Sequence, residues 1–216
     1  MLIYRNERGP YEKSTRNDLI NAAGQIIAEV GYASITNQAV AKRAGSSAPA
    51  IGYYFGGKPG LYKAVLAEAH QRFISMNELE AISQSDMSAE EKLKAVLRLI
   101  VRTARCSSEF WWAAVLFREM LSFSHVSQQP LLESALPKLA LLRTLVRDVM
   151  GVPSDSLEAR YAVAFLTLPH LALLLFPSEL KHSILPEQDA DLERFEETFC
   201  AYVLGGLRGM REAFAY

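Results

Sequence analysis

The chain has 216 residues, of which 50% are hydrophobic and 22% are charged. This composition supports a sizeable buried core and excludes an intrinsically disordered chain. The net charge of −1 is unevenly distributed, because residues 1–60 contain seven Lys or Arg and four acidic residues, a net +3, whereas the remainder carries −4. Such a distribution is expected when only the first segment of a protein contacts phosphate groups.

The start of the chain lacks the layout of a signal peptide, since charged residues interrupt it from Arg5 onward. The most apolar run, residues 161–176, contains a proline and a histidine and is shorter than the roughly 20 residues that cross a bilayer. We therefore expect a cytoplasmic protein that does not enter the membrane. Cys106 and Cys200 lie far apart with no histidine nearby, which favours free thiols and predicts neither a metal site nor a cofactor.

Apolar residues recur at helical spacing between Thr15 and Val30, which predicts an amphipathic first helix. Thr15 is suited to cap the start of this helix. Gly31 directly follows the last apolar residue, where a left-handed residue commonly ends a helix. The first helix is therefore expected to span residues 15–30.

A short second helix is predicted over residues 37–44, with Thr36 as its N-cap and Gly45 at its end. Ser47 is positioned to cap a third helix that runs to about Tyr54. Two helices joined by a turn that contains glycine form the arrangement that places a recognition helix in the major groove of DNA. Simple packing of short helices is the alternative, so the pattern alone leaves DNA binding open.

The residues from Pro59 onward predict a larger helical part. A long helix from Pro59 to about Met76 would join the two parts, and Ser88 with Glu91 forms a capping box for a helix that ends near residue 105. The last two of the remaining predicted helices are so apolar that their surface is hard to bury within one subunit. These remaining helices span residues 108–123, 130–150, 155–176 and 189–214.

The first third of the chain resembles the N-terminal domain of the TetR family of transcriptional regulators. The resemblance rests on Ala22-Ala23, Val30-Gly31-Tyr32, Ile35-Thr36, Ala39-Val40-Ala41, Ala44-Gly45, Tyr53-Tyr54-Phe55-Gly56-Gly57-Lys58, Leu61 and Ala64-Val65-Leu66. Residues 47–58 and 117–122 are most similar to the CecR subgroup. The family implies an all-α fold of about nine helices, with a three-helix helix-turn-helix domain at residues 1–58 and a helical ligand-binding and dimerisation domain at residues 59–216.

By this resemblance, two groups of residues contact DNA. The residues that face base edges are Ser47, Ala48, Pro49, Ala50 and Gly52. The residues that hold phosphates are Thr36, Tyr53, Tyr54 and Lys58. Thr36 and Ser47 also combine a hydroxyl group with the exposed backbone N–H groups of a helix N-terminus, which suits a phosphate.

The predicted recognition helix is poor in side-chain donors. Many family members carry an aromatic residue where this chain has Gly52, so one contact is missing. The first turn of the helix, residues 48–50, cannot form the bidentate pairs that Arg makes with guanine or Asn with adenine. We therefore predict that bases are read through thymine methyl groups, through Ser47 and Tyr53, and through DNA shape.

Residues 109–120 are unusually aromatic and, with polar side chains from other helices, predict an apolar pocket with a few polar groups, the usual form of a small-molecule site. Ordinary core is the alternative interpretation for each aromatic residue, and a solvated or interhelical salt bridge is the interpretation of Arg118 with Glu119. The predicted lining residues are Arg105, Trp111, Trp112, Phe117, His125, Tyr161, Phe165 and His170.

Together with these features, the resemblance implies a ligand-responsive repressor that forms a homodimer through its last two helices. A two-fold dimer presents two DNA-binding domains, so its operator is expected to be a pseudo-palindrome in double-stranded DNA. No paired carboxylates, nucleophile with a base, or cofactor loop stands out, which argues against an enzyme. A helical protein-interaction module without DNA binding is the alternative, and salt-dependent DNA binding would separate the two functions.

Overall fold

The computed structural model describes residues 10–106, 110–121, 125–153, 156–175, 183 and 192–214. These residues form helices and no strand, so the predicted all-α fold is confirmed. The helices are α1 (Pro10–Val30), α2 (Asn37–Arg43), α3 (Ala48–Phe55), α4 (Lys58–Phe73), α5 (Met76–Gln84), α6 (Ala89–Cys106), α7 (Trp111–Leu121), α8 (His125–Met150), α9 (Leu157–Leu175) and α11 (Leu192–Ala213).

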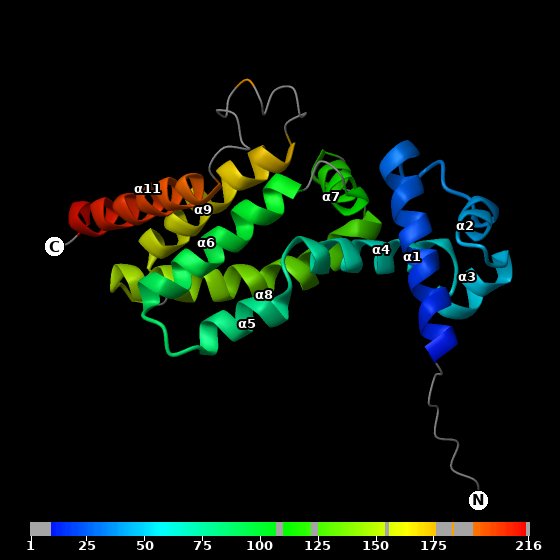
Figure 1. Cartoon of the computed structure of the whole chain (residues 1–216), viewed down its shortest axis with the longest axis horizontal. Helices are drawn as coiled ribbons and strands as arrows, with labels where there is room; N and C mark the ends of the chain where they lie inside the picture. The colour runs from blue at the N-terminus through cyan, green and yellow to red at the C-terminus, as the bar shows by residue number, and fades with distance from the viewer. Residues whose placement is uncertain are drawn as a thin grey trace, which may run out of the picture.

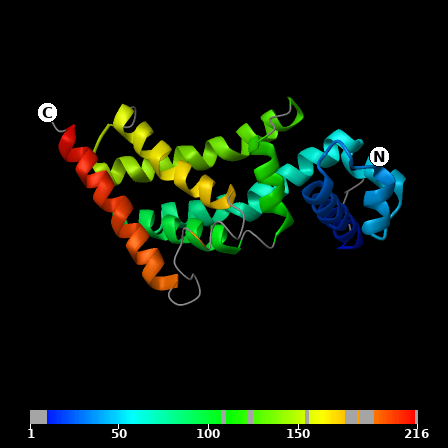
Figure 2. The same cartoon turned by 90° about the horizontal axis from the view of Figure 1, so that it is seen from above.

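The molecule is elongated, with a small unit at one end. Helices α1–α3 make up this unit, which we call the head, and α4 runs from it toward the other helices (Figure 1). Helices α5, α6, α8, α9 and α11 form the body, and α11 lies at the end farthest from the head (Figure 2). No helix in the described ranges is long and apolar enough to span a bilayer.

Most predicted helix ends in the head are confirmed. The Oγ1 atom of Thr36 accepts a hydrogen bond of 3.2 Å from the backbone N–H of Ala39, as an N-cap does. Gly31 and Gly45 have φ angles of 81° and 62°, the left-handed conformation expected after α1 and α2. Ser47 occupies the N-cap position of α3, but its hydroxyl makes no capping hydrogen bond. The predicted position of Ser47 as the N-cap residue is therefore correct, but the predicted capping hydrogen bond of its side chain is not formed.

Three predicted helix boundaries are wrong, and one of them is the start of α8, which lies at His125 and not at residue 130. Helix α1 begins at Pro10 and not at Thr15, because proline fits the first turn of a helix, where no N–H donor is needed. The predicted helix to Met76 breaks at Ile74, whose backbone is extended with φ −148° and ψ 120°. The break lets the Ile74 side chain enter the hydrophobic core of the body, where it is buried.

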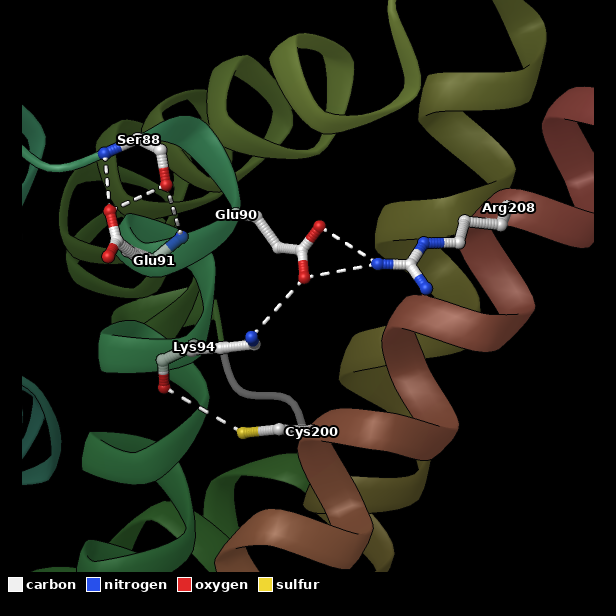
Figure 3. A network of polar contacts seen from close by, with 6 residues as sticks. All are labelled: Ser88, Glu90, Glu91, Lys94, Cys200 and Arg208. Atoms are coloured by element: carbon white, nitrogen blue, oxygen red, sulfur yellow. Dashed lines mark hydrogen bonds and ion pairs between the residues drawn. The ribbon is translucent and has the colours of Figure 1, made fainter.

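The capping box at the start of α6 is confirmed (Figure 3). The backbone N–H of Ser88 donates to Glu91 Oε2 at 2.8 Å, and the N–H of Glu91 donates to Ser88 Oγ at 3.3 Å. Next to this box, Glu90 accepts hydrogen bonds of 3.0 and 3.1 Å from Arg208 of α11. Farther along, Arg102 of α6 forms a bidentate pair of 2.6 and 3.0 Å with Glu196, and these ion pairs fasten α11 to α6.

Two separate groups of buried apolar residues hold the structure together. The body cluster joins α5, α6, α8, α9 and α11, and it includes Cys200, a free thiol as predicted. The head cluster contains residues of α1, α2 and α3, but also Tyr62 and Val65 of α4 and Trp112 and Val115 of α7. Helix α7 therefore packs with the head, although it follows the body helices α5 and α6 in sequence.

The two C-terminal helices, α9 and α11, differ in how much of their apolar surface is exposed. The apolar face of α11 is turned inward, since Val203 and Leu207 are buried against the body. For Val203 and Leu207 the expectation that this face is hard to bury within one subunit is wrong, because periodicity identifies an apolar face but not what covers it. Helix α9, in contrast, exposes a continuous apolar stripe, formed by Leu157, Tyr161, Phe165 and Leu168, each more than half exposed.

Candidate nucleic-acid interface

The residues predicted to contact DNA lie on α2, on α3 and at the start of α4. Exposed among them are Thr36, Ser47, Pro49, Gly52 and Tyr53, and Tyr53 is 74% exposed. Ala48, Ala50, Tyr54 and Lys58 are half-buried. Helix α3 thus turns one side outward along its length, as a helix that enters a groove must do.

The inner side of α3 is anchored in the head cluster. Ile51 is fully buried, and Tyr54 and Phe55 pack against the same cluster. The Arg16 guanidinium lies 5.3 Å from the centroid of the Phe55 ring, a cation–π contact that joins α1 to the end of α3. The buried Ile51 and the half-buried Phe55 thus fix which residues of α3 face outward.

Lys58 joins the start of α4 to the turn before α2. Its Nζ atom donates to the carbonyl oxygen of Ala33 at 3.2 Å and lies 4.9 Å from the centroid of the Tyr32 ring. Tyr32 in turn stacks on Tyr62 with ring centroids 4.0 Å apart. An ammonium group has three donors, so Lys58 keeps donors for a phosphate while it holds this turn in place.

An ion pair ties the last turns of α1 and α2 together. The Nη1 and Nη2 atoms of Arg43 donate to the two carboxylate oxygens of Glu29 at 2.7 and 3.0 Å. The hydrogen bond from Arg43 lowers the pKa of the Glu29 carboxyl group. Sequence analysis missed this pair, because the two residues belong to different helices and no periodic pattern links them.

The residues predicted to line an effector pocket do not meet in one cavity of the described part. Trp112 is buried in the head cluster, and Trp111 packs against that cluster half-buried. Phe117 is also half-buried on α7. Tyr161 and Phe165 lie on the exposed stripe of α9, stacked with ring centroids 6.4 Å apart. The side chains of Arg105, His125 and His170 lie outside the described residues.

Two hollows occur elsewhere in the described part of the body. A cavity of about 130 Å³ between α4, α5 and α8 is lined by His70, Gln71, Glu133 and Lys138, among others. A wider groove of about 370 Å³ between α8 and α9 is lined by Leu136, Leu139, Ala140, Arg143, Arg160 and Val163. Neither hollow includes a residue that sequence analysis predicted for the effector.

The smaller cavity contains two ionisable groups with unusual pKa values. Lys138 donates to the backbone carbonyl oxygen of His70 at 2.6 Å, and burial lowers the pKa of Lys138 to about 8. Burial, followed by the charge of Lys138, lowers the pKa of His70 to about 4. His70 is therefore neutral in the folded protein at pH values where an unfolded histidine is protonated.

This histidine should make the protein sensitive to acid. Between pH 6.5 and about pH 4 the unfolded chain binds a proton that folded His70 does not, so the free energy of unfolding falls as the pH drops. We expect this group to contribute a loss of about 2 kcal/mol between pH 7 and pH 4.5. Urea unfolding of the wild type and of His70→Gln at both pH values measures it. An equal loss in the two proteins would contradict the assignment.

Comparison with known proteins adds to this geometry. A family model described as bacterial regulatory proteins, tetR family, matches residues 19–65. The HTH-type transcriptional regulator BetI of Escherichia coli K12 is 31% identical over 160 residues, which cover 70% of this chain and 77% of the relative.

Solved structures of low sequence identity share the fold. A putative transcriptional regulator from Pseudomonas aeruginosa PAO1 superposes with a TM-score of 0.73 at 19% identity, covering 98% of both chains. FadR from Bacillus subtilis, in complex with stearoyl-CoA, superposes with a TM-score of 0.67 at 20% identity, covering 88% of this chain and 98% of FadR.

Proposed function

The chain belongs to the TetR family of bacterial regulatory proteins, and we propose that it is a cytoplasmic, ligand-responsive repressor that binds a pseudo-palindromic operator as a homodimer. As a member of this family it is a DNA-binding transcriptional regulator and not an enzyme. The observation that carries the proposal is the outward side of α3, which is held in place by the buried Ile51. Within the family, residues 47–58 and 117–122 favour the CecR subgroup.

The proposed DNA contacts divide into two groups. Ser47, Ala48, Pro49, Ala50 and Gly52 face base edges, whereas Thr36, Tyr53, Tyr54 and Lys58 hold phosphates. The N-terminus of α3 supports this division, because the Ser47 hydroxyl makes no capping hydrogen bond and remains available to DNA. In this proposal residues 1–58 bind DNA, and residues 59–216 bind the ligand and form the dimer. Helix α7 belongs to the second segment but packs against the first.

The proposed dimer interface is formed by α9 and α11. The exposed stripe of α9 supports this interface, because it is unfavourable to leave four large apolar side chains on one face of a helix exposed to water. On α11, Gly205 and Gly209 have no other atoms near the position of an added Cβ. Their open surface allows the backbone of a partner helix to approach closely.

The proposed effector is a small molecule that binds in the body, near the aromatic segment of α7. The stearoyl-CoA bound to the FadR neighbour supports a small-molecule effector for this fold. Such an effector lowers operator affinity only as far as it binds one conformation of the dimer more tightly than the other.

Selection of bound fragments from random duplex DNA, followed by titration at two salt concentrations, tests the DNA-binding function. We expect the selected DNA sequence to be a pseudo-palindrome. The affinity of the protein for it should fall about a thousandfold between 50 and 200 mM salt, because several phosphate contacts release counterions. Weak binding without enrichment would instead support a helical protein-interaction module.

Ser47 and Tyr53 should determine which operator bases matter. Ser47→Ala removes the hydroxyl group at the N-cap position of α3 and is expected to lower operator affinity about fivefold. Tyr53→Ala should lower affinity further and alter the preferred bases when the selection is repeated. Ser83→Ala, on α5 in the body, is the matched control and should leave affinity and preference unchanged. Strong guanine dependence opposite residues 48–50 would contradict this scheme.

A further inference from the structure

Helix α7 is attached to the head at its first turn. A Cβ atom added to Gly24 of α1 would overlap the indole ring of Trp111, so the ring lies directly against the α1 backbone. The guanidinium of Arg72, on α4, lies 5.2 Å from the centroid of the Trp111 ring. Arg72 also donates to Asn21 Oδ1 of α1 at 2.8 Å. This attachment therefore brings three helices, α1, α4 and α7, together at one point.

A second attachment occurs near the last turn of α7. Arg118 Nε donates to the carbonyl oxygen of Ala28 at 3.1 Å, and its Nη2 donates to that of Glu29 at 3.2 Å. These carbonyl groups belong to the last turn of α1, where acceptors lack partners within the helix and the helix dipole is negative. The guanidinium is thus a cap for α1 that comes from a distant part of the chain.

The contacts continue from α1 to the DNA-facing helices. The backbone oxygen of Glu29 accepts from Arg118, and its carboxylate binds Arg43 in the last turn of α2. Helix α2 begins at Asn37, directly after its N-cap Thr36, and α3 follows α2 through the turn at Gly45. A displacement of α7 relative to α1 would therefore act on the same residues that hold α2 in place.

We propose that Arg118 is a positioning residue for DNA recognition, which fixes the angle of the head relative to α4 and the body. The two attachments are seven residues apart on α7, about 10 Å along the helix, and two points this far apart resist rotation better than one. Without Arg118 we expect the head to remain folded but to vary in its angle relative to α4. This inference rests on the proposed function as a two-headed operator-binding dimer.

The spacing between operator half-sites tests this role, because a fixed head angle permits only one distance between two recognition helices. With a series of operators that differ by single base pairs in half-site spacing, we expect a sharp affinity optimum for the wild-type protein. For Arg118→Gln we expect about a tenfold loss at the optimal spacing and less than about a twofold loss at the neighbouring spacings. A residue that only stabilises the fold would lower affinity equally at every spacing.

Two further variants keep the test interpretable. Arg118→Lys retains one donor for the α1 carbonyl groups and should give an intermediate optimum. Lys92→Gln, on α6 and away from the head, is the matched control and should bind like the wild type. Urea unfolding shows that each variant is folded.

Two outcomes overturn the proposal: an unchanged optimum in Arg118→Gln, or a loss that is equal at all spacings. If the wild type binds no operator at any spacing, the proposed function itself fails, which is a distinct result from an unchanged optimum in the variant.

Discussion

Gly60→Ala is expected to lower the free energy of unfolding by about 3 kcal/mol, the upper range for overpacking a tight contact. A Cβ atom at Gly60 would overlap the backbone carbonyl oxygen of Phe55, at the end of α3. Neither atom can move aside as the tip of a flexible side chain can, so α4 must shift away from α3. Because α4 carries Tyr62 and Val65 into the head cluster, the shift also disturbs the packing that supports α3.

Gly52→Ala is the matched control for this experiment. Gly52 is likewise a glycine within a helix, in α3, but an added Cβ there meets no atom within 4 Å. Alanine should therefore raise the free energy of unfolding by roughly 0.5 to 1 kcal/mol through its helix propensity. Urea unfolding followed by circular dichroism measures both variants. If Gly60→Ala were as stable as Gly52→Ala, the close approach of α4 to α3 would be wrong.

Phe165→Glu is expected to convert the proposed dimer into monomers and to abolish high-affinity operator binding. Phe165 is 64% exposed in the centre of the α9 stripe, and a carboxylate there would have to be buried against the partner's apolar surface. We expect the dissociation constant of the dimer to rise by at least about 30-fold, the effect of losing one strong interface contact. Sedimentation velocity over a range of concentrations measures it.

Met87→Glu is the control for the dimer experiment. Met87 is an exposed apolar residue between α5 and α6, outside the α9 stripe, so the same charge there should leave the dimer intact. A wild-type protein that is monomeric at micromolar concentration, or a Phe165→Glu variant that stays dimeric, would contradict an interface through α9.

Local structure in the head could be predicted from the sequence because its signals lie within a few residues of one another. Thr36 caps α2, and Gly31 and Gly45 adopt the left-handed conformation after the helices that they end. The capping box at Ser88 is a pattern of the same short range. Each of these features depends on backbone groups next to the residue itself, so one segment suffices to identify it.

Contacts between distant segments could not be predicted in this way. The approach of Trp111 to Gly24 joins residues 87 positions apart, and the only local hint was a glycine inside an amphipathic helix. Similarly, Arg118 was interpreted as half of a salt bridge with Glu119, whereas its guanidinium binds carbonyl groups of α1. Hydrophobic periodicity correctly found α11 but did not reveal that the body covers its apolar face.

The uncapped Ser47 has a consequence for how this regulator can change over time. A side chain that holds its own helix together cannot be replaced without cost, but the Ser47 hydroxyl makes no such hydrogen bond. Its replacement therefore leaves the folding of α3 nearly untouched while it alters what the helix presents to DNA. If Ser47 faces base edges as proposed, operator preference can drift at this position independently of stability, which makes residue 47 a suitable first position to randomise when new operators are sought.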